Sequence, residues 1–465
     1  LGLRVGQVFE AAIPIAIIAV GIGNLAKKNN MLGQNVIIQS IGASSGVIVA
    51  GAIFTLPALY ILELDADFYQ IFLSSLFGGL LGILMLIPFR KYFVKDMHGK
   101  YPFPEATATT EVLVSGEKKG NQAKLLAVSG LIGGLYDFIV STFGWWTDTI
   151  STRIMGWGDM LAEKTKVVFK VNTGAALLGL GYIIGLKYAA IICAGSFAVW
   201  FVLIPFISYF ADGQTVAVGE GVTALIRDMS PEALFSNYAR HIGIGGIAMA
   251  GVIGIVRSSG IIKKALGLAV SELKGKKGAE ETAERTQRDL SMKFIMAGIL
   301  ATLITTFIFF RFGVLGNWFQ TVIAILIVFV ISFLFTTVAA NAIAIVGTNP
   351  VSGMTLMTLI LASLVLVSAG LSGTSGMMAA MIIGGVVCTA LSMAGGFITD
   401  LKIGYWLGTT PAKQEAWKFL GTAVSAATVA GVMIILNKAY GFVGEGAMVA
   451  PQANAMAAVI RPLME

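Results

Sequence analysis

The chain has 465 residues, of which 56% are hydrophobic and 12% are charged, and its formal net charge is +7. Soluble domains carry about twice that share of charged residues, so the composition excludes an ordinary soluble protein. A nucleic-acid partner for the positive charge is excluded as well, because the basic residues lie in loops on one side of a series of long apolar runs. The sequence therefore predicts an all-α fold, a polytopic bundle of membrane helices.

Twelve apolar runs are predicted to be membrane spans. A helix needs about 20 apolar residues to cross about 30 Å of hydrocarbon. The stretch 312–399 alone has 88 residues without Asp, Glu, Lys or Arg, which is room for three spans and their turns. The glycine pairs Gly42/Gly46 and Gly181/Gly185 have the spacing that lets helices approach closely in lipid. The predicted spans are 6–23, 36–62, 69–89, 124–146, 167–186, 188–210, 241–256, 293–311, 318–346, 351–371, 375–397 and 416–436.

The charges of the connecting loops predict the orientation. Alternating the loops assigns to one side 24–35, 90–123, the junction at Lys187, 257–292, the turn at Pro350 and 398–415. That set, with the few residues beside it, holds 22 of the 32 lysines and arginines. Loops rich in Lys and Arg face the cytoplasm. We therefore expect a multi-pass protein of the plasma or inner membrane with these loops in the cytoplasm.

The polar loop 257–292 is the predicted boundary between two halves. It has mixed charges and no apolar stripe, which is typical of a flexible connection. The N-terminal half is then 1–256 and the C-terminal half 293–465. Both ends of the chain are expected to be incomplete, because residue 1 is Leu and the last apolar segment stops abruptly.

Two acidic residues lie within predicted spans. Glu10 is in the first apolar run, and Asp137 is in the middle of the span 124–146. Charged groups at membrane depth are costly and usually face a cavity or a partner. The chain has only two histidines, so these carboxylates are the expected proton carriers if proton movement is coupled to its activity. For Glu10 the alternative is a side chain near a helix end that reaches the membrane surface.

A proline-rich stretch, YPFPEATATTEVL at 101–113, precedes the fourth span. Pro102 and Pro104 favour an extended backbone. Glu105 then opens a helix-like run, where its charge suits the positive end of the helix dipole. Threonines such as Thr107 are poor choices for a plain cytoplasmic helix but suit one that re-enters a polar vestibule. The alternative is a capped surface helix.

The uncharged stretch contains a predicted helix break at 345–355. Pro350 removes a backbone donor, and Gly347 and Gly353 free the backbone angles. Non-helical backbone at membrane depth persists only where protein or a watered cavity satisfies its polar groups. The side chains that would line such a pocket are Thr348, Asn349, Ser352 and Thr355. The alternative is a tight turn between two helices.

Six motifs, spread in order over nearly the whole chain, together resemble the oligopeptide transporter (OPT) superfamily. They are EAAIP at 10–14, YPFPEATATTEVL at 101–113, ARHIGIGGIAM at 239–249, TNPVSGMT at 348–355, DLKIGYWLGTTPAKQ at 400–414 and APQAN at 450–454. The resemblance implies a secondary transporter, generally proton-coupled, for small peptides or metal chelates. The architecture looks like the prokaryotic branch, related to the yellow stripe-like transporters of metal–nicotianamine and metal–phytosiderophore complexes.

The resemblance also implies where substrate would bind. Carried over by motif, the substrate contacts are Glu10, Glu105, Thr107, Asn349, Ser352 and Thr355. Two departures stand out: Ala106 replaces a usual glycine, and Ile403 replaces a residue that is often threonine. No cofactor and no resident metal are expected, since the chain has no Cys/His cluster. A metal would arrive inside its chelator.

Other classes of function are less well supported by the sequence. An ion channel would favour rings of charge or a short repeated filter. A membrane enzyme would need a catalytic motif, and HExxH and Walker motifs are absent from the sequence. The expected partners are the lipid bilayer, a small peptide or chelate, and protons or another coupling ion. A homodimer is one arrangement that the sequence leaves open.

Overall fold

The computed structural model describes residues 11–25, 31–64, 66–117, 121–147, 149–211, 224–243, 284–347, 351–444 and 450–465, with residue 3 and scattered positions at 245–267 and 447–448. The chain divides into two compact units, one of residues 1–119 and 250–465 and the other of residues 120–249. We call them unit 1 and unit 2 and describe each by itself. The predicted division into halves at 257–292 stays a prediction.

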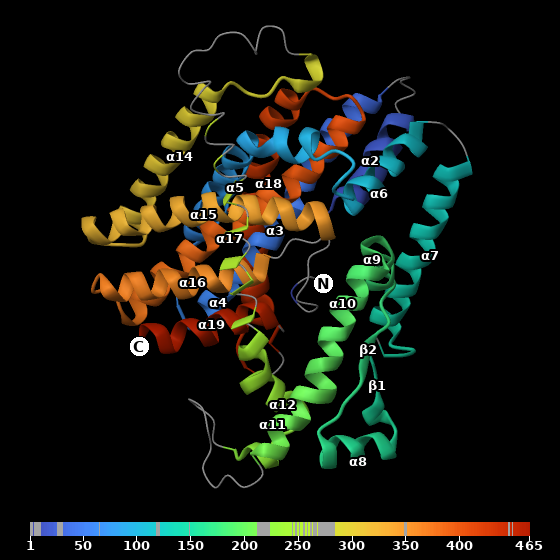
Figure 1. Cartoon of the computed structure of the whole chain (residues 1–465), viewed down its shortest axis with the longest axis vertical. Coiled ribbons are helices and arrows are strands. Elements are labelled where there is room, and N and C mark those ends of the chain that lie inside the picture. Colours follow the sequence, from blue (N-terminus) through green and yellow to red (C-terminus); the bar gives the residue numbers. More distant parts are fainter. Residues whose placement is uncertain are drawn as a thin grey trace. The chain divides into compact units, whose positions relative to one another are not determined.

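Unit 1 is helical. Its elements are α2 (Ala12–Leu25), α3 (Leu32–Thr55), α4 (Pro57–Ile61), α5 (Phe68–Arg90), the π-helical turn η1 (Lys91–Asp96), α6 (Pro104–Glu117), the 3-10 turn η6 (Arg285–Gln287), α14 (Met292–Gly313), α15 (Trp318–Val346), α16 (Val351–Ser368), α17 (Gly373–Trp406), α18 (Pro411–Tyr440) and α19 (Pro451–Met464). Helices from the two ends of the sequence, blue α3 and α5 and orange-red α17 and α18, pack side by side in Figure 1.

Helix α17 is the centre of unit 1. It is buried along most of its length and packs against α3, α5, α15 and α16. Small residues permit this packing. A Cβ at Gly78 or Gly82 of α5 would lie 2.3 or 2.4 Å from the carbonyl oxygens of Val386 and Ala390 in α17. The two backbones therefore touch, as close packing of membrane helices requires.

The two glycine pairs singled out by their spacing have different surroundings. Cβ atoms at Gly42 and Gly46 would lie 2.7 Å from atoms of Ile15 and Ala11, so the close approach predicted there is confirmed between α3 and the start of α2. A Cβ at Gly181 or Gly185 would meet nothing within 4 Å in the part of the chain that the structure describes. Spacing predicted a close approach at both pairs, and among the described residues only the first is observed.

Helix boundaries follow local sequence signals. Asp67 and Gln70 form a capping box at the start of α5, in which the Asp67 amide donates to the Gln70 side chain at 3.1 Å. Asn317 caps α15 by accepting from the Phe319 amide at 2.9 Å. Side chains that accept from free amides at a helix start stabilise that start, by about 0.5–2 kcal/mol in measured cases. Prolines open α4, α6, α18 and α19, where a missing amide costs nothing.

The described part of unit 2 is helical except for one short ribbon. Its elements are α7 (Asn121–Phe143), β1 (Thr149–Ser151), the 3-10 turn η2 (Thr152–Ile154), α8 (Gly156–Thr165), β2 (Lys170–Asn172), α9 (Ala175–Ile184), α10 (Leu186–Phe197), the π-helical turn η3 (Ala198–Leu203), α11 (Ile204–Phe210), the 3-10 turn η4 (Ile226–Asp228), α12 (Pro231–Leu234) and the π-helical turn η5 (Phe235–Ala239). β1 and β2 pair antiparallel, with Ile150 opposite Val171. The prediction of a purely α fold therefore holds apart from this ribbon.

The predicted spans can be compared with the helices one by one. Among the described residues, seven helices are long and apolar enough to cross a membrane, and each coincides with a predicted span. They are 32–61, 68–96, 186–210, 285–313, 318–346, 373–406 and 411–440. Shorter apolar helices lie within the predicted spans 6–23, 124–146 and 351–371. Twelve full spans are thus not observed.

The predicted span 167–186 is wrong. Residues 170–172 pair with 149–151 as a strand, and α9, which follows, has only 10 residues. Gly174 precedes α9, and Gly185 ends it with φ +84°, a conformation that L side chains rarely adopt. Apolar composition concealed these interruptions. Of the predicted span 241–256, residues 241–243 and scattered positions up to 256 are described, and they are helical.

Candidate functional site

The proline-rich stretch and the helix break meet within unit 1. α15 ends at Val346, and Gly347 follows in the left-handed conformation with φ +80°. The Phe103 amide donates to the Ala344 carbonyl at 3.0 Å. A Cβ at Gly347 would lie 2.6 Å from Cγ of Pro104. Glycine is therefore required at this position both by the backbone conformation and by the approach of Pro104. We call this contact the 103/347 junction.

Phe103 has an unusual backbone conformation at the junction. Its φ is +44°, in the left-handed region that residues other than glycine seldom occupy. Such a conformation persists where the surroundings over-determine it, and it is often found at functional sites. The Phe103 side chain is buried, and the Lys402 ammonium lies 5.2 Å from its ring centroid. Lys402 also donates to the Val94 carbonyl at 2.7 Å, so α17 and η1 both fix this turn.

The first turns of α6 carry the predicted polar residues. Glu105 is buried in the first turn, where the helix dipole favours its charge. Thr107 is exposed, and its hydroxyl donates to the Phe103 carbonyl at 3.0 Å. The hydroxyls of Thr109 and Thr110 are buried without a hydrogen-bond partner among the described residues. Buried polar atoms nearly always have a hydrogen-bond partner. These two hydroxyls therefore mark a place where a bound polar group would complete their hydrogen bonding.

The predicted break is present, since α15 ends before Gly347 and α16 begins at Val351. Gly353 lies inside α16 and is not part of the break. Thr355 is fully buried and donates to the Val351 carbonyl at 2.7 Å, so its hydroxyl already has a partner. Asn349 and Pro350 lie outside the described residues, as does the side chain of Ser352.

The two predicted proton carriers have different outcomes. Glu10 lies outside the described residues. Asp137 is half-buried on α7 in unit 2, and its Oδ1 accepts from the Ala175 amide at 2.9 Å. A carboxylate at the start of α9 satisfies a free amide and interacts favourably with the helix dipole. The partner that the sequence did not reveal is therefore a helix N-terminus.

Comparison with known proteins tests the resemblance. The profile of the OPT oligopeptide transporter protein family matches residues 1–465, the whole chain. The chain belongs to the OPT oligopeptide transporter family. It is 29% identical, over 496 residues, to a protein of Haemophilus influenzae (strain ATCC 51907 / DSM 11121 / KW20 / Rd) named "Putative oligopeptide transporter". That alignment covers 99% of this chain and 74% of the other protein.

Membership of this family decides between a transporter and the other classes of function considered above. The chain is a multi-pass membrane transporter of the OPT family and not an enzyme, and the family implies a peptide substrate. The resemblance predicted from the six motifs is confirmed. The apolar character of its exposed helices fits a membrane location, since Leu186 and Tyr209 at the two ends of the 186–210 helix are 86% and 78% exposed in the chain.

A buried ion pair in this OPT transporter was not predicted from the sequence. Asp400 accepts from the Lys418 ammonium at 2.6 Å and from the Gln39 amide at 2.9 Å. The Lys418 ammonium also donates to the Ser40 carbonyl at 2.8 Å, and both charged side chains are at most 1% exposed. A buried ion pair must be well hydrogen-bonded to offset its desolvation, and this one is. The signal in the sequence was the position of Gln39 and Lys418 inside the apolar runs 36–62 and 416–436.

Three loops of the OPT transporter that share a predicted side meet at one end of unit 1. Arg285 donates to the Gly408 carbonyl at 2.9 Å. Arg90 donates to the Asp289 carboxylate at 2.9 Å. Contacts between these segments require that they lie on the same side of the membrane, as their charges indicate. The loops are 90–123, 257–292 and 398–415.

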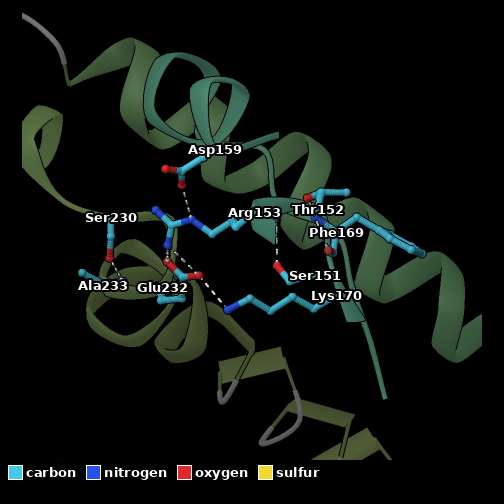
Figure 2. Close-up of polar contacts among 9 residues, drawn as sticks. All are labelled: Ser151, Thr152, Arg153, Asp159, Phe169, Lys170, Ser230, Glu232 and Ala233. Atoms are coloured by element: carbon cyan, nitrogen blue, oxygen red, sulfur yellow. Dashed lines mark hydrogen bonds and ion pairs between the residues drawn. The ribbon is translucent and has the colours of Figure 1, made fainter. Parts of the chain in front are cut away.

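Unit 2 of the transporter contains a separate ionic cluster, shown in Figure 2. Glu232 on α12 binds two basic residues of the ribbon region, accepting from Lys170 at 2.7 Å and from Arg153 at 3.1 Å. Arg153 also binds Asp159 at 3.2 Å. Burial alone would raise the pKa of the Glu232 carboxyl, but the hydrogen bond from Lys170 and the charges of Lys170 and Arg153 outweigh it and lower that pKa. This cluster ties the ribbon to α12 and is structural.

Proposed function

We propose that the chain moves small peptides, or metal chelates built like peptides, across the cell membrane by proton symport, with its substrate site at the 103/347 junction. The observation that carries the proposal is the meeting of helix ends there. The C-terminus of α15 contacts the N-terminus of α6 through the Phe103–Ala344 hydrogen bond, and α16 begins four residues after Gly347. Broken helices that end near one point are the usual binding sites of secondary transporters.

The charges of these helix ends suit a zwitterion. The amides at the start of a helix favour an anionic group, and the carbonyls at the end of a helix favour a cation. A peptide backbone has one group of each kind, a carboxylate and an ammonium. Glu105, buried in the first turn of α6, adds an acidic partner for the ammonium, and a chelate with amino and carboxyl groups has the same two charges.

Transport itself is the first test. Purified protein in proteoliposomes should exchange an internal unlabelled tripeptide or tetrapeptide for the radiolabelled one outside, and an inward proton gradient should raise the accumulated amount. Metal–nicotianamine, added as a competitor, reports whether chelates share the site. Absence of exchange for every peptide and chelate tested would contradict the assignment of this substrate class.

The polar residues of the break provide a sharper test. Asn349→Ala and Ser352→Ala should each weaken substrate binding by about 0.5–1.5 kcal/mol, roughly one hydrogen bond, with little change in melting temperature. If these side chains only close a turn, their removal should lower the melting temperature and leave affinity intact. Thr355→Val should lower the melting temperature and leave affinity intact, because the Thr355 hydroxyl is bonded to the Val351 carbonyl. Affinity and melting temperature are measured on the same purified variants.

Proton coupling is assigned, as the sequence suggests, to carboxylates in the membrane. Glu10→Gln should abolish accumulation driven by a proton gradient and leave exchange intact, because the amide keeps the shape and loses the titrating proton. For Asp137→Asn the same result is expected if it carries a proton. A capping role alone predicts a nearly unchanged melting temperature and unchanged coupling, because an asparagine caps nearly as well as an aspartate.

A further inference from the structure

Glu415 is a fully buried acid that the proposed substrate site does not use. It lies in the first turns of α18 and is 0% exposed. Its Oε2 accepts from the Leu290 amide at 2.7 Å. Among the described residues no amide, hydroxyl or cationic donor reaches the other oxygen, Oε1. Asp289, the residue before Leu290 in the same segment, is a second acid, and its side chain interacts with that of Glu415.

One cation serves both acids. Arg90, 1% exposed at the end of α5, donates from Nη2 to Asp289 Oδ2 at 2.9 Å, and its Nε lies against Oδ1. The arginine binds Asp289 and also donates to the Gln287 carbonyl at 3.4 Å, and its effect on Glu415 is through charge. With both acids ionised the cluster would have one uncompensated negative charge in a buried place. Burying such a charge costs several kcal/mol, and two facing carboxyls avoid that cost by sharing a proton.

The other charged groups near the cluster are engaged elsewhere. Lys418, one turn further along α18, is bound to Asp400 of α17 at 2.6 Å. Arg285 on the same segment as Asp289 reaches the Gly408 carbonyl and the Thr410 hydroxyl. The other basic side chains near the cluster in the sequence are exposed, and they are Lys91, Arg288, Lys293 and Lys413.

We propose that Glu415 and Asp289 form a proton-binding site that holds one shared proton beside Arg90, and that this proton is one that the transporter couples to substrate movement. The proposal rests on the proposed proton symport and adds a site to it. The shared proton joins segment 284–290 to α5 and α18, because Asp289 and the Leu290 amide belong to that segment. Loss of the proton places two negative charges against each other and weakens this attachment. Proton binding would therefore favour the docking of segment 284–290 on α5 and α18, and proton release would weaken it.

The test combines infrared spectroscopy with transport. A protonated carboxylic acid absorbs apart from a carboxylate, so wild-type protein near neutral pH should show a buried carboxylic-acid band that disappears in Glu415→Gln. The amide in this variant still accepts from the Leu290 amide and can donate to Asp289, so the fold is expected to survive. Glu415→Gln should exchange peptide normally, while its accumulation ratio in a proton gradient falls to unity. Glu284→Gln, an exposed glutamate of the same segment, should behave as wild type.

A second variant keeps the test decisive if Glu415→Gln does not fold. In Asp289→Asn, Glu415 becomes the counter-ion of Arg90 and should ionise, so the carboxylic-acid band should again disappear and accumulation should be lost. Presence of the band in wild type and its loss in either variant, together with lost accumulation, supports the proposal. A band that is absent from wild type, or accumulation that persists in the folded variants, overturns it.

The failure of the underlying function has a different signature. If wild-type protein exchanges peptide but ignores the proton gradient, proton symport is wrong, and the coupling role of this pair falls with it. If wild type and Glu415→Gln both accumulate peptide while Glu10→Gln does not, symport stands and the assignment to Glu415 and Asp289 is overturned.

Discussion

Gly347 and Phe103 show how single residues position the ends of helices. Both have left-handed backbone conformations, with φ +80° and +44°, on the two sides of the contact between α15 and α6. The glycine adopts this conformation freely, whereas the phenylalanine does so at a cost that its buried ring and the Lys402 contact offset. The geometry of the proposed site therefore depends on two backbone angles as much as on polar side chains.

Replacement of Gly347 by alanine tests this dependence, and Gly370 supplies the matched control. Both glycines have nearly the same φ, +80° and +78°, so alanine costs about 1–2 kcal/mol of backbone strain at each. Only at Gly347 would the new Cβ also meet Pro104, at 2.6 Å, whereas Gly370 has nothing within 4 Å. We expect Gly347→Ala to lower the melting temperature more than Gly370→Ala and to weaken substrate binding. Equal losses of stability with unchanged affinity would contradict a role for the junction.

At the scale of elements, apolar patterning predicted the helices well and their interruptions less well. Length and hydropathy located the seven long helices, because a lipid-crossing helix must be apolar along its length. The same rule failed at 167–186, where a glycine on each side of α9 and a two-stranded ribbon interrupt an apolar run. Ribbon pairing between 149–151 and 170–172 depends on a tertiary contact, and helix periodicity does not encode it.

The candidate site was predictable where a motif or a helix breaker marked it. Pro104 and Gly347 were singled out separately, but their contact joins residues far apart in the sequence and has no local signature. The same holds for Gln39 and Asp400, whose side chains are bonded across 361 positions. Glu415 was overlooked because it stands beside other charges at the edge of an apolar run. Only packing shows that its carboxyl is buried against Asp289.

The ribbon of unit 2 gives a pH prediction at this scale. The pKa of Glu232 is lower in the folded protein than its ordinary value of 4.5, so its ion pairs stabilise the fold above that value. This contribution is lost as the pH falls through the lowered folded-state pKa, because the protonated acid no longer attracts Lys170 and Arg153. Amide hydrogen exchange in 149–172, corrected for the intrinsic pH effect, should therefore speed up as the pH falls below 4.5 and through the lowered pKa of Glu232.

Two variants check the assignment of this pH dependence. Glu232→Gln should show faster exchange in 149–172 already at neutral pH and should lose most of the acid-induced change. Glu163→Gln, at an exposed position on α8, should match wild type at every pH. Acid-induced exchange that survives in Glu232→Gln would assign the effect to another group, such as Asp159.

At the scale of the whole molecule, the loop charges and the observed contacts address different parts of the topology. The contacts of Arg285 with Gly408 and of Arg90 with Asp289 require three loops to lie together. Contacts within a protein carry no information about which side of the membrane is the cytoplasm. That part rests on the charge bias, because positively charged loops are retained in the cytoplasm during insertion.

Side-specific labelling decides the orientation. Cysteine at Glu284, in the basic segment, and cysteine at Glu63, in the acidic loop, are both at exposed positions. They are introduced into a background with Cys193→Ser and Cys388→Ala, because Cys193 is itself exposed. In intact cells an impermeant maleimide should label Glu63→Cys and leave Glu284→Cys unlabelled, and permeabilisation should expose both. The reverse pattern would invert the assignment and place the proposed Glu415–Asp289 proton site at the outer end of the transporter. Labelling of both positions in intact cells would contradict the span count between them, since an odd number of crossings must separate opposite sides.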